Sequence, residues 1–207
     1  MDPNQAFIGW LLVGGTLIGL AMVGHPALVR IWAMPRESHV AAVARHRVVW
    51  ALLNAGFVLA TLSTAAAIIA MSVTMYAGSD WSAALLATGV AYAIGGVLWC
   101  AVLAIRTRTT PLLHEIGPES YRGQPVRLLD AVTTGLFDAF VVICSLAIVA
   151  LGLVLLVAGG VAAAVCIALI VTGIGCFVWL LITGDVIPAV LYLPTLLLGI
   201  ALLTNWT

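Results

Sequence analysis

The chain has 207 residues, of which 64% are hydrophobic and only 8% are charged, and its formal net charge is zero. A soluble domain is about one quarter charged, so this composition predicts a polytopic membrane protein. All eight basic residues are arginine, and the absence of lysine excludes a retinal Schiff base and pyridoxal phosphate chemistry. With no basic stripe in the sequence, we expect no nucleic-acid partner.

Long apolar runs indicate where the membrane-spanning helices lie, because such a helix needs about 20 apolar residues. The run from 131 to 183 is too long for one span, and Gly159 and Gly160 predict a tight turn inside it. We predict an all-α integral membrane protein, a single transmembrane domain over residues 1–207 with a bundle of six helices. The predicted spans are residues 7–24, 48–76, 83–105, 131–157, 161–183 and 186–203. The last run is short and contains Pro188 and Pro194, so five spans with a re-entrant last segment is the alternative.

The arginines lie in two of the segments that connect the spans. These are Arg30, Arg36, Arg45 and Arg47 after the first span, and Arg106, Arg108, Arg122 and Arg127 after the third. The positive-inside rule makes that face cytoplasmic and places both termini on the extracytoplasmic side. We expect a multi-pass protein of a cell membrane, the cytoplasmic membrane of a bacterium. The first connecting segment mixes apolar and basic residues, which fits an interfacial helix or a solvated loop equally.

The first span contains Gly15 and Gly19 in a GxxxG pattern. This pattern is typical of close helix contacts in membranes. Its partner is either another span of this chain or a second copy.

Asp138 is the most unusual polar residue, because it lies in the apolar fourth span, ten residues after Leu128, where this helix enters from the cytoplasmic side. An aspartate in mid-membrane costs roughly 2.5–3.5 kcal/mol on insertion scales. Such residues usually face a bundle interior or a water-filled cavity and mark function. Asp130, Thr134 and Asp138 follow an i, i+4, i+8 spacing, which predicts one polar face turned into the bundle. The alternative is a structural carboxylate paired with Arg47 or Arg106.

Span two contains Arg47, Asn54 and Thr61 at intervals of seven residues, with Trp50 between them. The Asn54 amide needs partners in a dry environment, so it is either a site residue or an interhelical hydrogen-bonding residue. Trp99 in span three lies on a face that is typical of packing, and with Trp50 it is a candidate wall of a pocket.

Asp185 lies at the hairpin between the last two spans, and Tyr192 lies one to two turns into the last span. Gly184 and Pro188 open the helix end there, and unwound span ends line binding cavities in transporters. The alternative for Asp185 is a helix cap, because aspartate favours helix starts.

His25 and His46 lie at the same predicted membrane level, so one haem or metal ion between them is geometrically conceivable. However, His46 is flanked by arginines as an interfacial surface residue would be, and the four cysteines lie in apolar runs without ligand spacing. We therefore expect no metal site and no cofactor.

These polar residues gather in the cytoplasmic half of the predicted bundle, which predicts a polar cavity open to the cytoplasm with Asp138 as its deepest acid. The candidate acids for chemistry are Asp138 and Asp185. The candidates for substrate contact are Asn54, Arg47, Trp50, Trp99, Asp130, Thr134 and Tyr192.

Three functions fit this pattern. The first is transport or binding of a small solute or proton through Asp138. The second is a membrane-embedded enzyme that uses a buried acid on a lipidic or isoprenoid substrate. The third is an accessory subunit of a membrane complex. The expected partners are membrane lipid and either a second copy of the chain or another membrane subunit.

Overall fold

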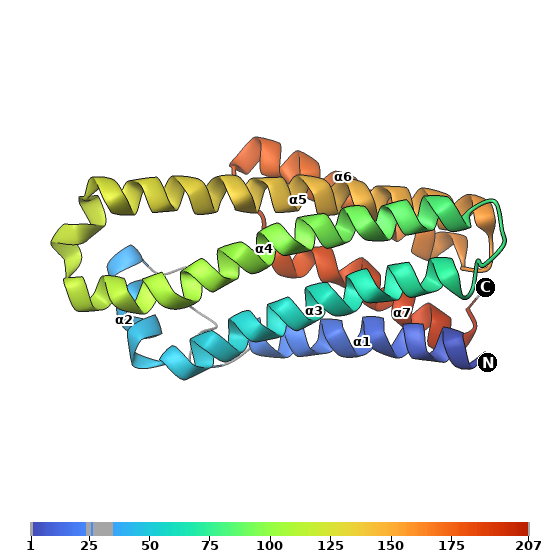
Figure 1. The fold of residues 1–207 in the computed structure, drawn as a ribbon, viewed down its shortest axis with the longest axis horizontal. Helices are drawn as coiled ribbons and strands as arrows, with labels where there is room; N and C mark the ends of the chain where they lie inside the picture. Colours follow the sequence, from blue (N-terminus) through green and yellow to red (C-terminus); the bar gives the residue numbers. More distant parts are fainter. Residues whose placement is uncertain (1, 24–25, 27–34, 207) are drawn as a thin grey trace.

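The computed structural model describes residues 2–23, 26 and 35–206, and the elements within these residues are all helical. The elements are α1 (Pro3–Val23), α2 (Arg36–Arg45), α3 (Arg47–Val73), α4 (Ser82–Ile116), the 3₁₀ helix η2 (Pro118–Arg122), α5 (Gln124–Ala158), α6 (Ala163–Thr183), the 3₁₀ helix η3 (Pro188–Tyr192) and α7 (Leu193–Thr204). The long helices run side by side along one axis, and the two chain ends lie together at one end of the bundle (Figure 1).

Five helices, α1, α3, α4, α5 and α6, are long and apolar enough to cross a membrane. Their outer faces are apolar, with exposed side chains such as Leu59, Val97 and Ile182. The chain is therefore a helical, multi-pass membrane protein, and the sequence-based prediction is confirmed at this level.

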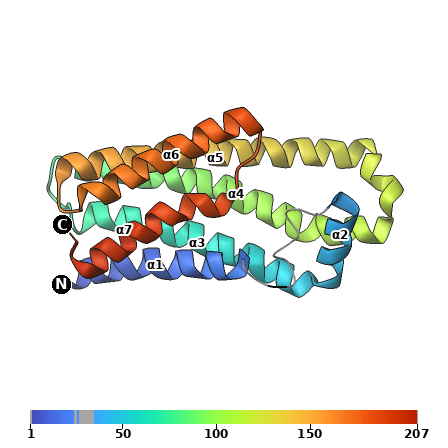
Figure 2. The same cartoon turned by 180° about the vertical axis from the view of Figure 1, so that it is seen from behind.

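The last predicted span differs from the other five, because it is broken into η3 and α7. Pro188 begins η3, and Pro194 lies in the first turn of α7, where its missing N–H breaks no helical hydrogen bond. With rises of about 2.0 Å and about 1.5 Å per residue, the two pieces together span about 28 Å, close to the hydrocarbon thickness of about 30 Å. α7 packs against α1 (Figure 2), and Gln5 Nε2 donates a hydrogen bond to the Leu202 carbonyl at 2.8 Å.

α4 and α5 are longer than the apolar runs predict. Each has 35 residues and α6 has 21, a difference of about 21 Å of helix at about 1.5 Å per residue. The segment 106–127, predicted as a connection between spans, is therefore mostly helix. Hydropathy marks only the lipid-embedded part, whereas arginine, leucine and glutamate also support a helix in water. α2 packs against α4 in this extension (Figure 1).

The turn between α5 and α6 lies at Gly159 and Gly160, the point at which the sequence predicts two helices to be divided. Both have positive φ, 76° and 84°, a conformation that favours glycine. Tyr76 Oη donates a hydrogen bond to the Gly159 carbonyl at 2.6 Å and so joins this turn to the end of α3. Burial raises the pKa of the Tyr76 phenol, so it remains a donor at neutral pH.

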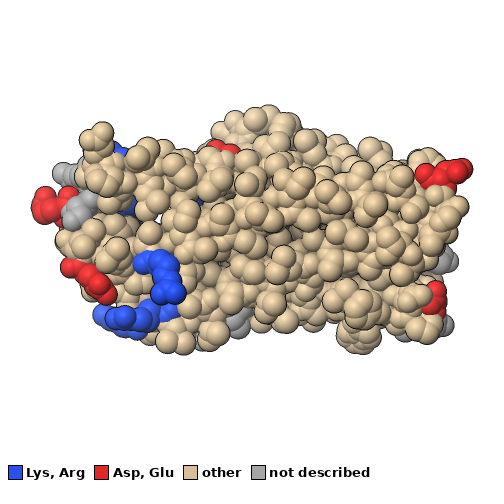
Figure 3. All heavy atoms as spheres, in the orientation of Figure 1, with Lys and Arg blue, Asp and Glu red and all other residues tan. Residues whose placement is uncertain are grey.

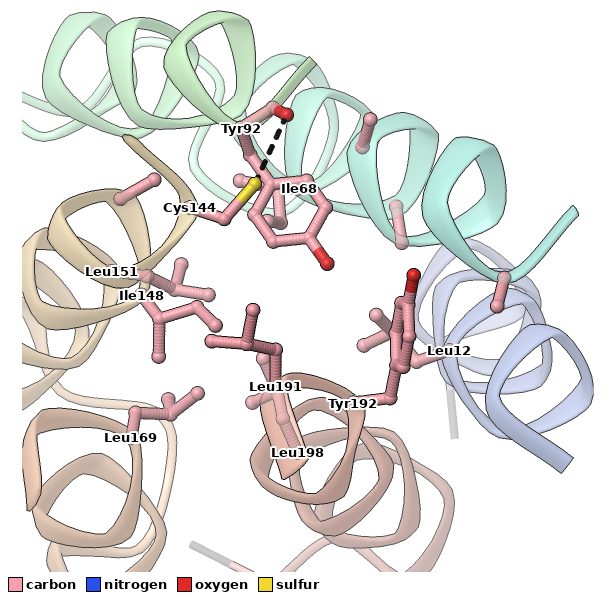
Figure 4. Packing of buried hydrophobic residues seen from close by; sticks show 14 of the residues in the cluster. Leu12, Ile68, Tyr92, Cys144, Ile148, Leu151, Leu169, Leu191, Tyr192 and Leu198 are labelled. Atoms are coloured by element: carbon pink, nitrogen blue, oxygen red, sulfur yellow. Dashed lines mark hydrogen bonds between the residues drawn. The ribbon is translucent and has the colours of Figure 1, made fainter. Parts of the chain in front are cut away.

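Glycines allow the closest helix contacts. A Cβ added at Gly15 would lie 2.6 Å from the Cβ of Ser63, and one at Gly19 would lie 3.1 Å from the Cβ of Ala60. The GxxxG partner is therefore α3 of the same chain. In the middle of the bundle Tyr92, Cys144 and Leu191 meet (Figure 4), and the Cys144 thiol lies 3.7 Å from the Tyr92 carbonyl. All three side chains are fully buried.

We predict that Gly173→Ala destabilises the bundle by about 1–3 kcal/mol, the usual range for overpacking. A Cβ at Gly173 in α6 would lie 2.7 Å from the Ser145 carbonyl of α5, and backbone atoms cannot move away as a side chain can. The measurement is the thermal unfolding temperature in a neutral detergent. Gly175→Ala is the matched control, since its added Cβ meets nothing within 4 Å. Equal unfolding temperatures for the two variants would contradict the described α5–α6 contact.

Candidate functional site

The arginines that the structure describes lie in α2, the start of α3, the last turns of α4, η2 and the start of α5. In Figure 3 the end of the molecule with α2 carries arginines and acids, whereas the end with the chain termini carries only acids. Asp2 and Asp80 are the acids of that second end. Arg30, which the sequence analysis assigned to the same group, lies outside the described residues.

A cavity of about 880 Å³ opens at this arginine-bearing end, where α6 has ended and α4 and α5 continue. Its walls come from α2, α3, α4, α5 and the segment Asp185–Ala189. The inner wall is aromatic and the mouth is charged. The aromatic residues are Trp50, Phe57, Trp99 and Phe137, and the ionisable residues are Arg36, His39, Arg106, Asp130 and Asp185. Ligand pockets in proteins typically measure about 300–1,000 Å³, so this volume suits a small molecule.

Trp99 is the centre of the aromatic wall. Its ring stacks on Phe140 with centroids 5.0 Å apart, and it contacts Phe137 at 5.5 Å and Phe57 at 5.9 Å. Phe57 also stacks on Tyr192 at 6.1 Å. These rings come from α3, α4, α5 and η3, so the wall is fixed from several directions and presents an apolar surface to the cavity.

The first pair of charges at the mouth is satisfied internally. Arg36 of α2 and Asp130 of α5 form an ion pair at 2.7 Å, with about half of each side chain exposed. The Arg36 guanidinium also lies over the Tyr121 ring, 5.8 Å from its centroid. An exposed ion pair contributes about 0–1 kcal/mol, so its clearest effect is to tie α2 to α5 across the mouth.

Arg106 differs from Arg36, because no described carboxylate forms an ion pair with it. Its guanidinium lies over the Phe137 ring, 5.9 Å from the centroid, and Asp185 and Asp130 attract it from a greater distance. The backbone carbonyl of Arg106 accepts a hydrogen bond from Trp50 Nε1 at 3.2 Å, which holds this part of α4 against α3. A guanidinium in this setting has donors available for an oxyanion.

The cavity brings together five of the predicted site residues and leaves out four. Those that line it are Trp50, Trp99, Asp130, Thr134 and Asp185, and those that do not are Arg47, Asn54, Asp138 and Tyr192.

Asp138 was expected to be the deepest acid of the cavity, yet it is not among the lining residues. It is seven residues from Ser145 and fourteen from Gly152, both of which contact α6, so it shares their α6-facing side of α5. Each residue of an α-helix rotates the side-chain direction by about 100°. Over the eight residues from Asp130 to Asp138 the direction therefore changes by about 80°, which turns Asp138 away from Asp130. Its Oδ1 is buried without a hydrogen-bond partner among the described residues, and neither Arg47 nor Arg106 pairs with it there.

Asn54 and Tyr192 form hydrogen bonds between helices behind the cavity wall. Asn54 Nδ2 donates to Thr107 Oγ1 at 2.8 Å and so joins α3 to α4. The hydroxyls of Tyr192 and Thr61 lie 2.7 Å apart and join η3 to α3. For Asn54, this is the interhelical arrangement that the sequence analysis left open beside a site role.

Arg47 is exposed and lines a smaller cavity of about 270 Å³ with Arg45, His114 and Glu115. Asp185 does not cap η3, whose N-cap is Ile187 without a side-chain cap. Instead its Oδ1 accepts a hydrogen bond from the Val186 N–H at 2.8 Å.

His25 lies outside the described residues, so the pairing of His25 with His46 is not described by the structure. Among the residues that are described, no group of three or more His, Cys, Asp or Glu side chains could hold a metal ion.

Sequence reasoning missed Phe57 and Arg36 as cavity residues. Phe57 follows Trp50 and Asn54 at helical spacing, and this buried stripe of α3 was a usable signal. Arg36 had no such signal, because its contact with Asp130 joins residues 94 positions apart in the chain.

Comparison with protein-family models, curated proteins and solved structures finds no match for this chain.

We predict that Asn54 and Thr107 are energetically coupled. Asn54→Ala and Thr107→Ala should each lower the unfolding temperature, and a double-mutant cycle should give a coupling of about 0.6 kcal/mol and at most about 1.7 kcal/mol, as for other polar pairs in membranes. Thr109→Ala is the control, because the Thr109 hydroxyl bonds within its own helix to the Ile105 carbonyl. Strict additivity of Asn54→Ala and Thr107→Ala would contradict the interhelical hydrogen bond.

Proposed function

We propose that this protein binds a small solute in a cavity open to the cytoplasm and carries it through the membrane. The observation that supports this most directly is the cavity itself, with its aromatic inner wall and charged mouth at the arginine-bearing end. Sites for small molecules are typically concave and mostly apolar, with a few placed polar groups.

The proposed orientation places the arginine-bearing end in the cytoplasm and both termini outside. The positive-inside rule supports it, as all arginines with described positions lie at one end. Trp10, in the first half of α1, and Trp206, after the end of α7, are more than half exposed, and amphipathic rings near the ends of spans suit a membrane interface.

This orientation predicts the behaviour of reporter fusions. Alkaline phosphatase joined after the C-terminus should be active, because it folds only outside the cytoplasm, and green fluorescent protein at that position should be dark. A fusion truncated at Gly117, in the turn after α4, should give the reverse pattern. Active phosphatase at Gly117 with fluorescence at the C-terminus would invert the proposed topology.

Asp138 remains part of the proposal as the acid that couples solute movement to a proton or cation. Two observations support this role. Its Oδ1 is buried without a described partner, and it lies one helical turn from the cavity residue Thr134. A polar atom without a partner in an apolar region is costly, which favours a second state in which the atom gains one.

We predict that ligands found by thermal-shift screening raise the unfolding temperature of the wild type by mass action, and that Thr134→Phe abolishes the shift. Thr134 lines the cavity, so a larger ring at this position should fill its space. Thr134→Ser is the matched control and should retain the shift. If Thr134→Phe responds to every ligand as the wild type does, the cavity is not the binding site.

The Asp138→Asn variant distinguishes ligand binding from transport across the membrane. With a ligand identified in that screen, Asp138→Asn should retain the thermal shift and lose most uptake into proteoliposomes. Unchanged uptake would exclude the coupling role of Asp138. An accessory subunit would show no ligand-dependent shift in any variant.

A further inference from the structure

We infer that the ligand of this cavity is a zwitterionic amphiphile, a molecule with one anionic group, one cationic group and an apolar tail. This inference rests on the proposed binding function and names the ligand class of the same site. Its basis is that Arg106 and Asp185, with opposite charges, both line the cavity and that neither forms an ion pair with a described residue.

The charge balance of the mouth favours a ligand without net charge. Arg36 and Asp130 neutralise one another at 2.7 Å, which leaves Arg106 and Asp185 as the charges available to a ligand. With His39 counted as neutral, the formal charges of the lining sum to zero, so a net anion would leave Asp185 without a partner and a net cation would leave Arg106 without one. Matching of opposite charges, together with the cost of a charge left unpaired, is how sites select among ligands.

Arg106 and Asp185 are each held in place by a neighbouring group. The Phe137 ring supports the Arg106 guanidinium through a cation–π contact, and the planar fork can donate two hydrogen bonds to a carboxylate or phosphate. The Val186 N–H donates to Asp185 Oδ1, which orients the carboxylate within the segment between α6 and η3. An ammonium group on the ligand would form an ion pair with the Asp185 carboxylate.

The apolar lining of the cavity favours an apolar part in the ligand. The aromatic rings of the inner wall are at least 94% buried, so the apolar surface that a ligand can reach is that of Leu113, Leu129 and Ile187, which also line the cavity and are not buried. A small hydrophilic zwitterion would fill only a fraction of about 880 Å³ and would leave these aliphatic side chains in contact with water. A tail or ring against these residues gains the hydrophobic contribution that the charges at the mouth do not supply.

The test uses the full chain in dodecyl maltoside and single-chain lipids with the same brominated acyl chain. Bromine quenches tryptophan fluorescence, and Trp50 and Trp99 line the cavity. The probes are lysophosphatidylethanolamine as the zwitterion, lysophosphatidic acid as the anion and monoacylglycerol as the neutral lipid. We expect saturable quenching that is strongest for the zwitterion.

Two variants test the two charges separately. Arg106→Gln and Asp185→Asn should each weaken binding of the zwitterion by about tenfold or more, because each removes one charge-assisted contact. For the anion, only Arg106→Gln should weaken binding, and Asp185→Asn should strengthen it. Arg106→Lys should bind the zwitterion with intermediate affinity, because lysine keeps the positive charge but lacks the planar guanidinium that donates two parallel hydrogen bonds.

Arg108→Gln is the control, because Arg108 is an exposed arginine on the same helix and does not line the cavity. The hydrogen bond from Trp50 reaches the backbone carbonyl of Arg106, so the side-chain variants retain this link between helices. Equal unfolding temperatures without ligand would confirm that the variants are folded.

Equal binding of all three lipids to the wild type and to both charge variants would overturn the inference. The proposed function would survive that result if Thr134→Phe still removed saturable binding. Tighter binding of lysophosphatidic acid than of the zwitterion would also overturn it. Competition by tail-less glycerophosphoethanolamine at equal affinity would contradict the need for a tail and identify a free polar solute instead of a lipid.

Discussion

The difference in length between neighbouring helices determines most of this architecture. α6 is about as long as the hydrocarbon layer is thick, whereas α4 and α5 continue for about four more turns. Beyond Thr183 the two long helices have lost α6 as a neighbour, and no further long helix takes its place. α2 and the segment Asp185–Ala189 cover part of this region, and the space that remains is the cavity. The site is thus a consequence of where α6 ends.

Polar side chains near the cavity have two distinct tasks. Asn54, Thr61 and Tyr192 form hydrogen bonds between helices, which satisfies their polar atoms and fixes the positions of the walls. Arg106 and Asp185 form no ion pair with a described residue, although they attract one another, and both line the cavity. Access to water in the cavity lowers the cost of keeping these two charges in an apolar bundle.

The sequence is sufficient to predict helical membrane character, because apolar length and segregated arginines are local features. It is insufficient for the lengths of α4 and α5, since the helix continues past Ile105 where hydropathy falls. It also misplaces Asp138, because a small drift per helical turn decides whether a side chain faces a cavity or α6. The Arg36–Asp130 pair depends on the packing of α2 across α5, which no local spacing encodes.

The segment from Asp185 to Tyr192 connects the mouth of the cavity to the centre of the bundle. Asp185 lies at the mouth, whereas Tyr192 is held by Thr61 and stacks on Phe57, which itself lines the cavity. The 3₁₀ helix between them is short, and the hydrogen-bond geometry of such helices is poorer than that of an α-helix. A ligand shifts such a segment only if it binds its two positions with different affinity. Under the proposed function, ligand contact with Asp185 supplies that difference, so the residue that selects the ligand also gives the ligand its means of moving this segment.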